Sequence, residues 1–119
     1  MKNLLLIGIL LSTVGCAHVR SSQIGEAYPP KPSDCAIDVY QDAASVTHKY
    51  VAVCMIDSKS GVNLFHDYSI ESVIARGKKV ACQKGCDAVI IQNAQTSDST
   101  YWKPGASSAS LLGIKYTDQ

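Results

Sequence analysis

The segment from Ser69 to Lys84 restricts the fold of this chain most, because its pattern predicts an amphipathic helix. Small and apolar residues recur at the spacing of one helix face, as Ile70, Val73, Ile74, Gly77, Val80 and Ala81. Asp67 or Ser69 can cap the start of this helix, and Gly85 supplies the left-handed residue that commonly ends one. The sequence therefore predicts a helix with a single apolar stripe and a sharp stop.

Four strands are predicted around this helix, because apolar alternation or dense apolar runs are bounded there by turn residues. They cover residues 35–40, 49–57, 87–93 and 109–116, and a polar loop from Ala94 to Ser108 separates the last two. The first two strands are expected to form an antiparallel hairpin, and the second reads as a central strand buried on both faces. The expected fold class is α+β, a small ββαββ domain with a mainly antiparallel sheet, one helix packed on it and disulfide staples.

Residues 1–15 have the pattern of an export signal. Lys2 gives a basic start, an apolar core runs from Leu4 to Leu11, and short side chains continue to Gly15. An apolar core of this length is too short to span a bilayer. The chain is therefore expected to be exported and its leader, a signal peptide, removed.

The end of this leader, Thr13-Val14-Gly15-Cys16, resembles the lipobox of bacterial lipoproteins. The resemblance implies cleavage before Cys16 and acylation of that cysteine, with palmitate or a similar chain, and two or more acyl chains make a stable anchor. Ala17 follows in place of Asp, which in Gram-negative lipoproteins implies transfer to the outer membrane, with the protein facing the periplasm. An ordinary signal peptide with an incidental cysteine is the alternative.

Residues 16–34 are expected to form the lipidated cysteine and a linker. No apolar periodicity is present there, and Pro29, Pro30 and Pro32 fall close together. A coil of this length spans roughly 20–25 Å. The linker would hold the domain at residues 35–119 just clear of the lipid headgroups of one membrane.

The predicted domain contains four cysteines, Cys35, Cys54, Cys82 and Cys86. An even set in the oxidising periplasm indicates two disulfides, although four cysteines allow three pairings. We expect Cys82, in the last turn of the helix, to pair with Cys86 just beyond it, and Cys35 to pair with Cys54 between neighbouring strands. Zinc binding is the alternative, but these spacings and the scattered histidines do not match a zinc site, so no metal ion is expected.

The segment Lys78–Ile91, with the sequence KKVACQKGCDAVII, resembles the helix-to-strand signature of small envelope proteins related to RcsF and of YbjQ-like domains. The strand at residues 35–40 and the run that begins at Tyr50 also match the opening of that family. The resemblance implies an outer-membrane lipoprotein that reports envelope damage by contacting partner proteins. A second implied role is an accessory subunit of a type IV secretion core complex of the Dot/Icm kind.

Composition and motifs argue against several other functions. Removal of the leader takes away Lys2, so the mature chain carries ten Lys and Arg against ten Asp and Glu. A neutral chain without a basic cluster argues against nucleic acid as a partner. Neither a Gly-x-Ser-x-Gly elbow, a phosphate-binding loop, a His-Glu-x-x-His motif nor a Cys-x-x-Cys motif occurs, so a non-catalytic protein without a cofactor other than its lipid is expected. Small-ligand or peptidoglycan binding and thiol redox chemistry at Cys82 are the alternatives.

An aromatic pair stands in the polar loop, as Tyr101 and Trp102, and Lys103 follows it. Aromatic residues beside a cation are typical of the anchors of protein interfaces. We therefore expect Tyr101, Trp102 and Lys103 to contact a partner protein. The alternative is that Trp102 covers the small core.

Overall fold

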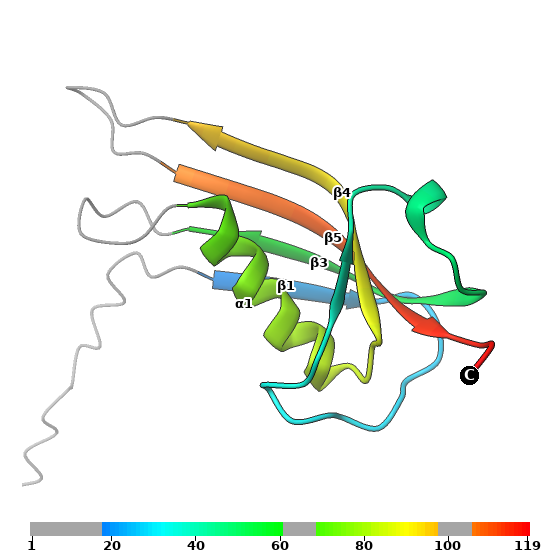
Figure 1. The fold of residues 1–119 in the computed structure, drawn as a ribbon. Helices are drawn as coiled ribbons and strands as arrows, with labels where there is room; N and C mark the ends of the chain where they lie inside the picture. The colour runs from blue at the N-terminus through cyan, green and yellow to red at the C-terminus, as the bar shows by residue number, and fades with distance from the viewer. Residues whose placement is uncertain (1–17, 61–68, 98–105) are drawn as a thin grey trace, which may run out of the picture.

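The computed structural model of the protein describes residues 18–60, 69–97 and 106–119. Its elements in chain order are β1 (His18–Gln23), β2 (Asp38–Tyr40), the 3-10 turn η1 (Ala43–Ser45), β3 (Tyr50–Lys59), α1 (Ile70–Gln83), β4 (Ala88–Ser97) and β5 (Ala106–Tyr116). The strands form one five-stranded sheet in the order β1-β3-β5-β4-β2, and α1 lies across one face of it (Figure 1). The expected α+β class, with a mostly antiparallel sheet and one helix packed on it, is confirmed.

Helix α1 begins and ends where its sequence signals predict. The side chain of Ser69 accepts a hydrogen bond from the backbone N–H of Ser72, which satisfies one of the free amides of the first turn. Gly85 follows the last turn with φ of 74°, and a Cβ there would lie 2.6 Å from the carbonyl oxygen of Pro29. Glycine is therefore required at this position both by the backbone conformation and by the close approach of another segment.

The main core lies between α1 and the sheet. Val73 and Ala81 of α1 are fully buried against Val53, Ile56 and Leu111 of the central strands. The hydroxyl of Ser58 in β3 donates a hydrogen bond of 2.7 Å to the carbonyl oxygen of Val73. The predicted apolar stripe is thus the buried face of the helix, and a buried polar contact fixes its first turns over the end of β3.

A second, smaller core covers part of the opposite face of the sheet. Side chains alternate between faces along a strand, so Leu112, Ile114 and Tyr116 point away from α1. Ile114 and Tyr116 are buried there with Ala88 and Ile90 of β4. Tyr40, Val46, Tyr50 and Leu112 pack against this cluster. The segment around η1 therefore acts as the second covering layer of the sheet.

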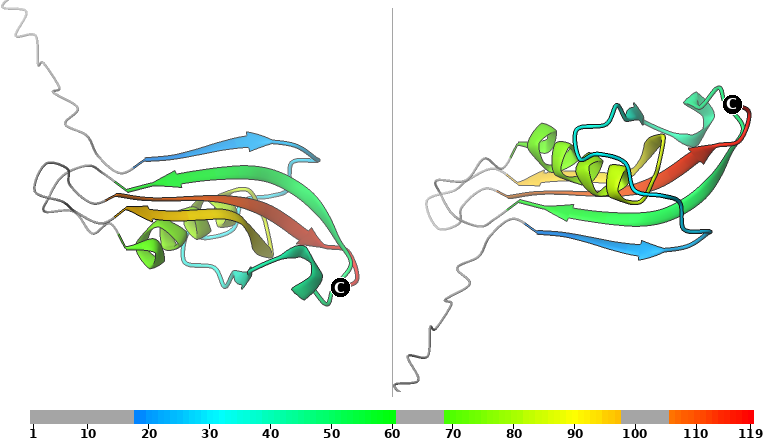
Figure 2. Two further views of the ribbon diagram at one scale, coloured as in Figure 1. Left: turned by 90° about the horizontal axis from the view of Figure 1, so that it is seen from above. Right: turned by 90° about the horizontal axis from the view of Figure 1, so that it is seen from below.

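The expectation of an irregular linker over residues 17–34 is wrong for its first part. Residues His18–Gln23 form β1, which pairs antiparallel with β3 along one edge of the sheet. Their sequence lacks apolar alternation, but the neighbouring strand supplies hydrogen-bonding partners that override this weak local preference. The next residues run past the C-terminal end of α1 to the opposite edge, as Figure 2 shows, and the backbone N–H of Lys31 donates to the carbonyl oxygen of Cys82.

The expected hairpin between residues 35–40 and β3 is also wrong. The strand β2 is short and pairs in parallel with β4 at the edge of the sheet farthest from β1, while β3 lies between β1 and β5. Nine residues, 41–49, separate β2 from β3 and carry η1, which is more than a tight hairpin needs. The expected polar loop is also shorter, because β4 extends to Ser97 and β5 begins at Ala106.

Candidate functional site

The structure joins Cys35 to Cys82 by a disulfide, with a Cα–Cα distance of 5.9 Å. The expected pairs Cys35–Cys54 and Cys82–Cys86 are therefore wrong. The cause is the position of Cys35, which precedes β2 at one edge of the sheet and lies beside the end of α1 rather than beside β3. The bridge fixes the segment between β1 and β2 to the last turn of the helix.

The other two cysteines, Cys54 and Cys86, are buried thiols whose side chains hydrogen-bond to each other. Both Sγ atoms also meet Gly113 of β5, where an added Cβ would lie 2.7 Å from Cys86 Sγ and 3.0 Å from Cys54 Sγ. The hydrogen bond with Cys54, together with burial, raises the pKa of Cys86 above its ordinary value. The expectation that all four cysteines are oxidised stays a prediction for this pair.

The surroundings of the two thiols determine what chemistry they can perform. Each has an exposed fraction of 0%, so an external thiol or substrate has no access to either sulfur. Reactive cysteines combine a lowered pKa with partial exposure. The hydrogen bond with Cys86 lowers the pKa of Cys54, but burial keeps reactants away from its sulfur. The geometry therefore favours a structural role in the core over thiol exchange with a partner.

Asp87 links three segments beside these cysteines. Its carboxylate accepts hydrogen bonds from Lys31 Nζ at 2.6 Å and from the backbone N–H of Tyr116 at 2.9 Å, and it forms an ion pair with Lys115 at 3.3 Å. Partial burial alone would raise the pKa of Asp87, but these donors lower it below its ordinary value. Both lysine partners lie far from Asp87 in the chain, so its local sequence does not indicate them.

A second polar cluster, which we call the tyrosine end, consists of Asp38, Tyr40, His48, Tyr116 and Asp118. The hydroxyl of Tyr116 donates to Asp38 and lies 2.7 Å from the hydroxyl of Tyr40. His48 stacks on the ring of Tyr116, with ring centroids 4.1 Å apart. Burial and these two hydrogen bonds raise the pKa of Tyr116, so it stays protonated and ties the last strand to β2. Sequence analysis missed this cluster, because its members are far apart in the chain.

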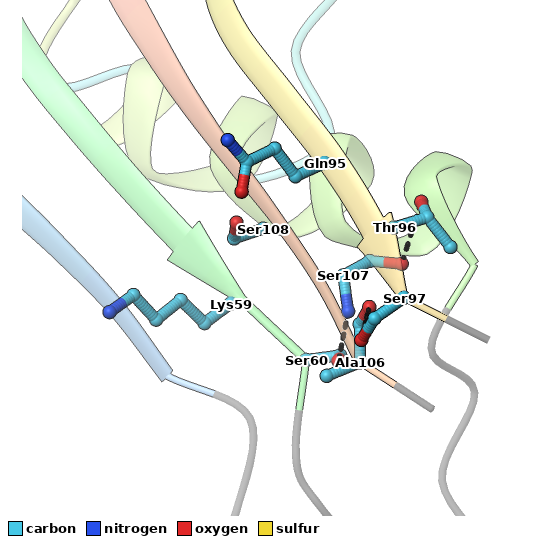
Figure 3. A pocket seen from close by; sticks show the side chains of 8 residues that line it. All are labelled: Lys59, Ser60, Gln95, Thr96, Ser97, Ala106, Ser107 and Ser108. Atoms are coloured by element: carbon cyan, nitrogen blue, oxygen red, sulfur yellow. Dashed lines mark hydrogen bonds between the residues drawn. The ribbon is translucent and has the colours of Figure 1, made fainter. Parts of the chain in front are cut away.

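The opposite end of the sheet is rich in hydroxyl groups, and Figure 3 shows the side chains that line a hollow there. This hydroxyl-rich end consists of Lys59, Ser60, Gln95–Ser97 and Ala106–Ser108, and its hollow has a volume of about 340 Å³. The backbone N–H of Ser107 donates to Ser60 Oγ, and Ser107 Oγ donates to Thr96 Oγ1. Most lining groups are neutral donors and acceptors, and the one ammonium is that of Lys59.

Two groups of sequence-predicted site residues lie outside the described residues. These are the proposed lipid attachment point, Cys16, and the proposed partner contact at Tyr101, Trp102 and Lys103. Their described neighbours lie at the same end of the sheet, because β1 begins at His18 and the strands that flank the loop reach Ser97 and Ala106. This end is the hydroxyl-rich end.

Within residues 18–60, 69–97 and 106–119, no three His, Cys, Asp or Glu side chains gather closely enough to hold a metal ion. In the same part of the chain no helix is both long and apolar enough to cross a membrane. Comparison with protein-family models, with curated protein sequences and with solved structures finds no significant match.

Proposed function

We propose that this protein is a bacterial lipoprotein, anchored by Cys16 in the outer membrane, whose periplasm-facing domain is a non-catalytic module that binds envelope proteins. The observation that carries the proposal is the position of Gly15-Cys16 directly after an apolar leader core. The positions of the other four cysteines support the proposal. Cys35 and Cys82 form a bridge, and Cys54 and Cys86 are buried in the core, so each of these four has a place inside the domain.

Two roles fit a tethered binding module of this kind. One is a sensor that reports envelope damage through contact with partner proteins, which the resemblance to RcsF suggests. The other is an accessory subunit of a secretion complex in the outer membrane. Both roles require a contact surface and neither requires catalysis, so the same capture experiment tests them together.

The proposed contact residues remain Tyr101, Trp102 and Lys103. Trp102→Ala should weaken capture of partner proteins from cross-linked envelopes and leave the domain folded, because an interface anchor contributes to binding and little to the core. Thr47→Ala, a truncation of an exposed side chain at the tyrosine end, is the matched control and should capture as the wild type does. Mass spectrometry of the cross-linked complexes measures the difference.

Two results would contradict this part of the proposal. An unfolded Trp102→Ala variant would make Trp102 a core residue and place the contact surface elsewhere. A purified domain that turns over a substrate, and loses that activity when one polar residue is changed, would overturn the non-catalytic role itself.

Small-ligand binding is a second candidate, because the hollow at the hydroxyl-rich end falls within the size range of ligand pockets. Its hydroxyl and amide lining suits a small sugar-like molecule. Saturable binding of a soluble muropeptide, measured by calorimetry and weakened by Ser107→Ala, would favour this candidate. Absence of binding at millimolar concentration would remove it.

A further inference from the structure

We infer that the hydroxyl-rich end of the sheet rests on the lipid headgroups of the bilayer that holds Cys16. The inference rests on the proposed acylation of Cys16 and adds which surface of the domain meets the membrane. It replaces the expectation of a long spacer between lipid and domain, because β1 occupies the first part of the supposed linker.

The tether between lipid and domain is very short. Ala17 alone separates Cys16 from His18, the first residue of β1. Consecutive Cα atoms are 3.8 Å apart, so the Cα atom of Cys16 lies no more than about 7.6 Å from that of His18. An acylated Cys16 sits at the lipid surface, and the start of β1 must therefore lie within one headgroup layer of it.

The register of the sheet places residues of β3, β5 and β4 in one row with the first residue of β1. His18 of β1 pairs with Lys59 of β3, Lys59 pairs with Ser108 of β5, and Ser108 pairs with Gln95 of β4. Neighbouring strands are about 4.8 Å apart, so the whole row spans about 14 Å. A domain held by the first residue of this row can place the remaining members of the row on the same flat surface.

The chemistry of this end suits headgroups rather than the apolar interior of a bilayer. Its described strand ends offer the exposed side chains of Lys59, Gln95, Thr96 and Ser97 and the half-buried hydroxyl of Ser108, whereas Ser60 and Ser107 are buried. The first turn of α1 adds the carboxylate of Glu71. Hydroxyls and an ammonium donate to phosphate and ester oxygens, whereas burial in hydrocarbon would leave them without partners. This end therefore contacts the membrane surface without entering it, and a partner bound through Tyr101, Trp102 and Lys103, which lie between Ser97 and Ala106 in the chain, would be an envelope protein at the same membrane.

The tyrosine end then faces the periplasm. β5 runs from Ala106 at the hydroxyl-rich end to Tyr116 at the tyrosine end. A rise of about 3.3 Å per residue makes this strand roughly 33 Å long. The two ends are thus far enough apart for a short-range probe to distinguish them.

Fluorescence quenching in vesicles tests the orientation. The full-length lipoprotein is purified with a small fluorescent amino acid at Gln95 or at Thr47, two exposed, uncharged positions at opposite ends of the domain. Each protein is reconstituted into vesicles of phosphatidylethanolamine and phosphatidylglycerol that contain a lipid with a nitroxide on its headgroup. We expect quenching to be several times stronger at position 95 than at position 47.

The outcomes separate the inference from the proposal on which it rests. A chain that does not float with the vesicles overturns both the lipid anchor and the inference. A chain that floats, but is quenched equally at both positions or more strongly at position 47, overturns the inference alone.

A variant with a longer tether tests whether the short tether causes this orientation of the domain. Twelve Gly and Ser residues inserted between Ala17 and His18 form a coil with a span of about 17–21 Å. The domain can then leave the surface, so quenching at Gln95 should fall while the chain still floats. Unchanged quenching at Gln95 would overturn the short tether as the cause of the orientation.

Discussion

The thiols of Cys54 and Cys86 hydrogen-bond to each other in the core of the domain, although the two residues lie on different elements. Cys54 belongs to β3, and Cys86 lies in the turn between α1 and β4. Gly113 of β5 leaves the space in which the two sulfur atoms meet. The chain thus brings a bridged pair, Cys35–Cys82, and an adjacent thiol pair to the same side of the sheet.

We predict that Cys54 and Cys86 are joined in protein isolated from an oxidising compartment. The bond would form before folding buries the two thiols, when a periplasmic dithiol oxidase can reach them and accept the two electrons and two protons that they lose. Intact mass under non-reducing conditions should then be lower than that of the reduced chain by four hydrogen atoms, and peptide mapping should join Cys54 to Cys86. Alkylation of both residues in denatured, unreduced protein would contradict this prediction.

Gly113→Ala should lower the free energy of unfolding by about 1–3 kcal/mol, as overpacking of a core does. The added Cβ would lie 2.7 Å from the sulfur of Cys86, a core residue with an exposed fraction of 0%. Urea denaturation measures the change. In a Cys86→Ala background the same substitution should cost less than half as much, and an equal cost in both backgrounds would exclude the sulfur contact as the cause.

Asp87→Asn should lower the free energy of unfolding at pH 7 by about 1–2 kcal/mol, because it removes a charged acceptor from Lys31 and from the N–H of Tyr116. The folded state lowers the pKa of Asp87. Its contribution is therefore present above the unfolded pKa of about 3.9 and is lost as the pH falls through the lower, folded value.

Urea midpoints between pH 7 and pH 2 check this pH dependence. The wild type should lose more stability than Asp87→Asn as the pH falls below about 4. The control is Asp34→Asn, at an exposed carboxylate, which should leave the profile unchanged. Parallel curves for the wild type and Asp87→Asn would contradict the assigned role of this carboxylate.

The helix and the three long strands could be predicted, because their signals are local. Ser69, the apolar stripe and Gly85 define α1, and dense apolar runs define much of β3, β4 and β5. β1 could not be predicted from the sequence HVRSSQ, since its strand conformation depends on pairing with β3. The parallel pairing of β2 with β4 is likewise a tertiary property that the residues of β2 do not encode by themselves.

The candidate sites also combine features that the sequence predicts with contacts that it does not predict. Cysteine counting identified the four domain cysteines, but their pairing depends on the position of Cys35, which follows from the pairing of β2 with β4 and not from the expected hairpin with β3. The lysine partners of Asp87 and the contact between Tyr40 and Tyr116 join residues far apart in the chain. Such contacts have no local sequence signal, so sequence analysis could not have found them.

Metabolic labelling with an alkyne-bearing palmitate analogue tests the central claim, the lipid anchor at Cys16, most directly. The analogue should label the wild-type protein, whose mature chain should begin at Cys16, and Cys54→Ser should label equally well. Cys16→Ser should remain unlabelled and accumulate as a precursor. Labelling of Cys16→Ser at the wild-type level, or an unlabelled wild type, would contradict the account.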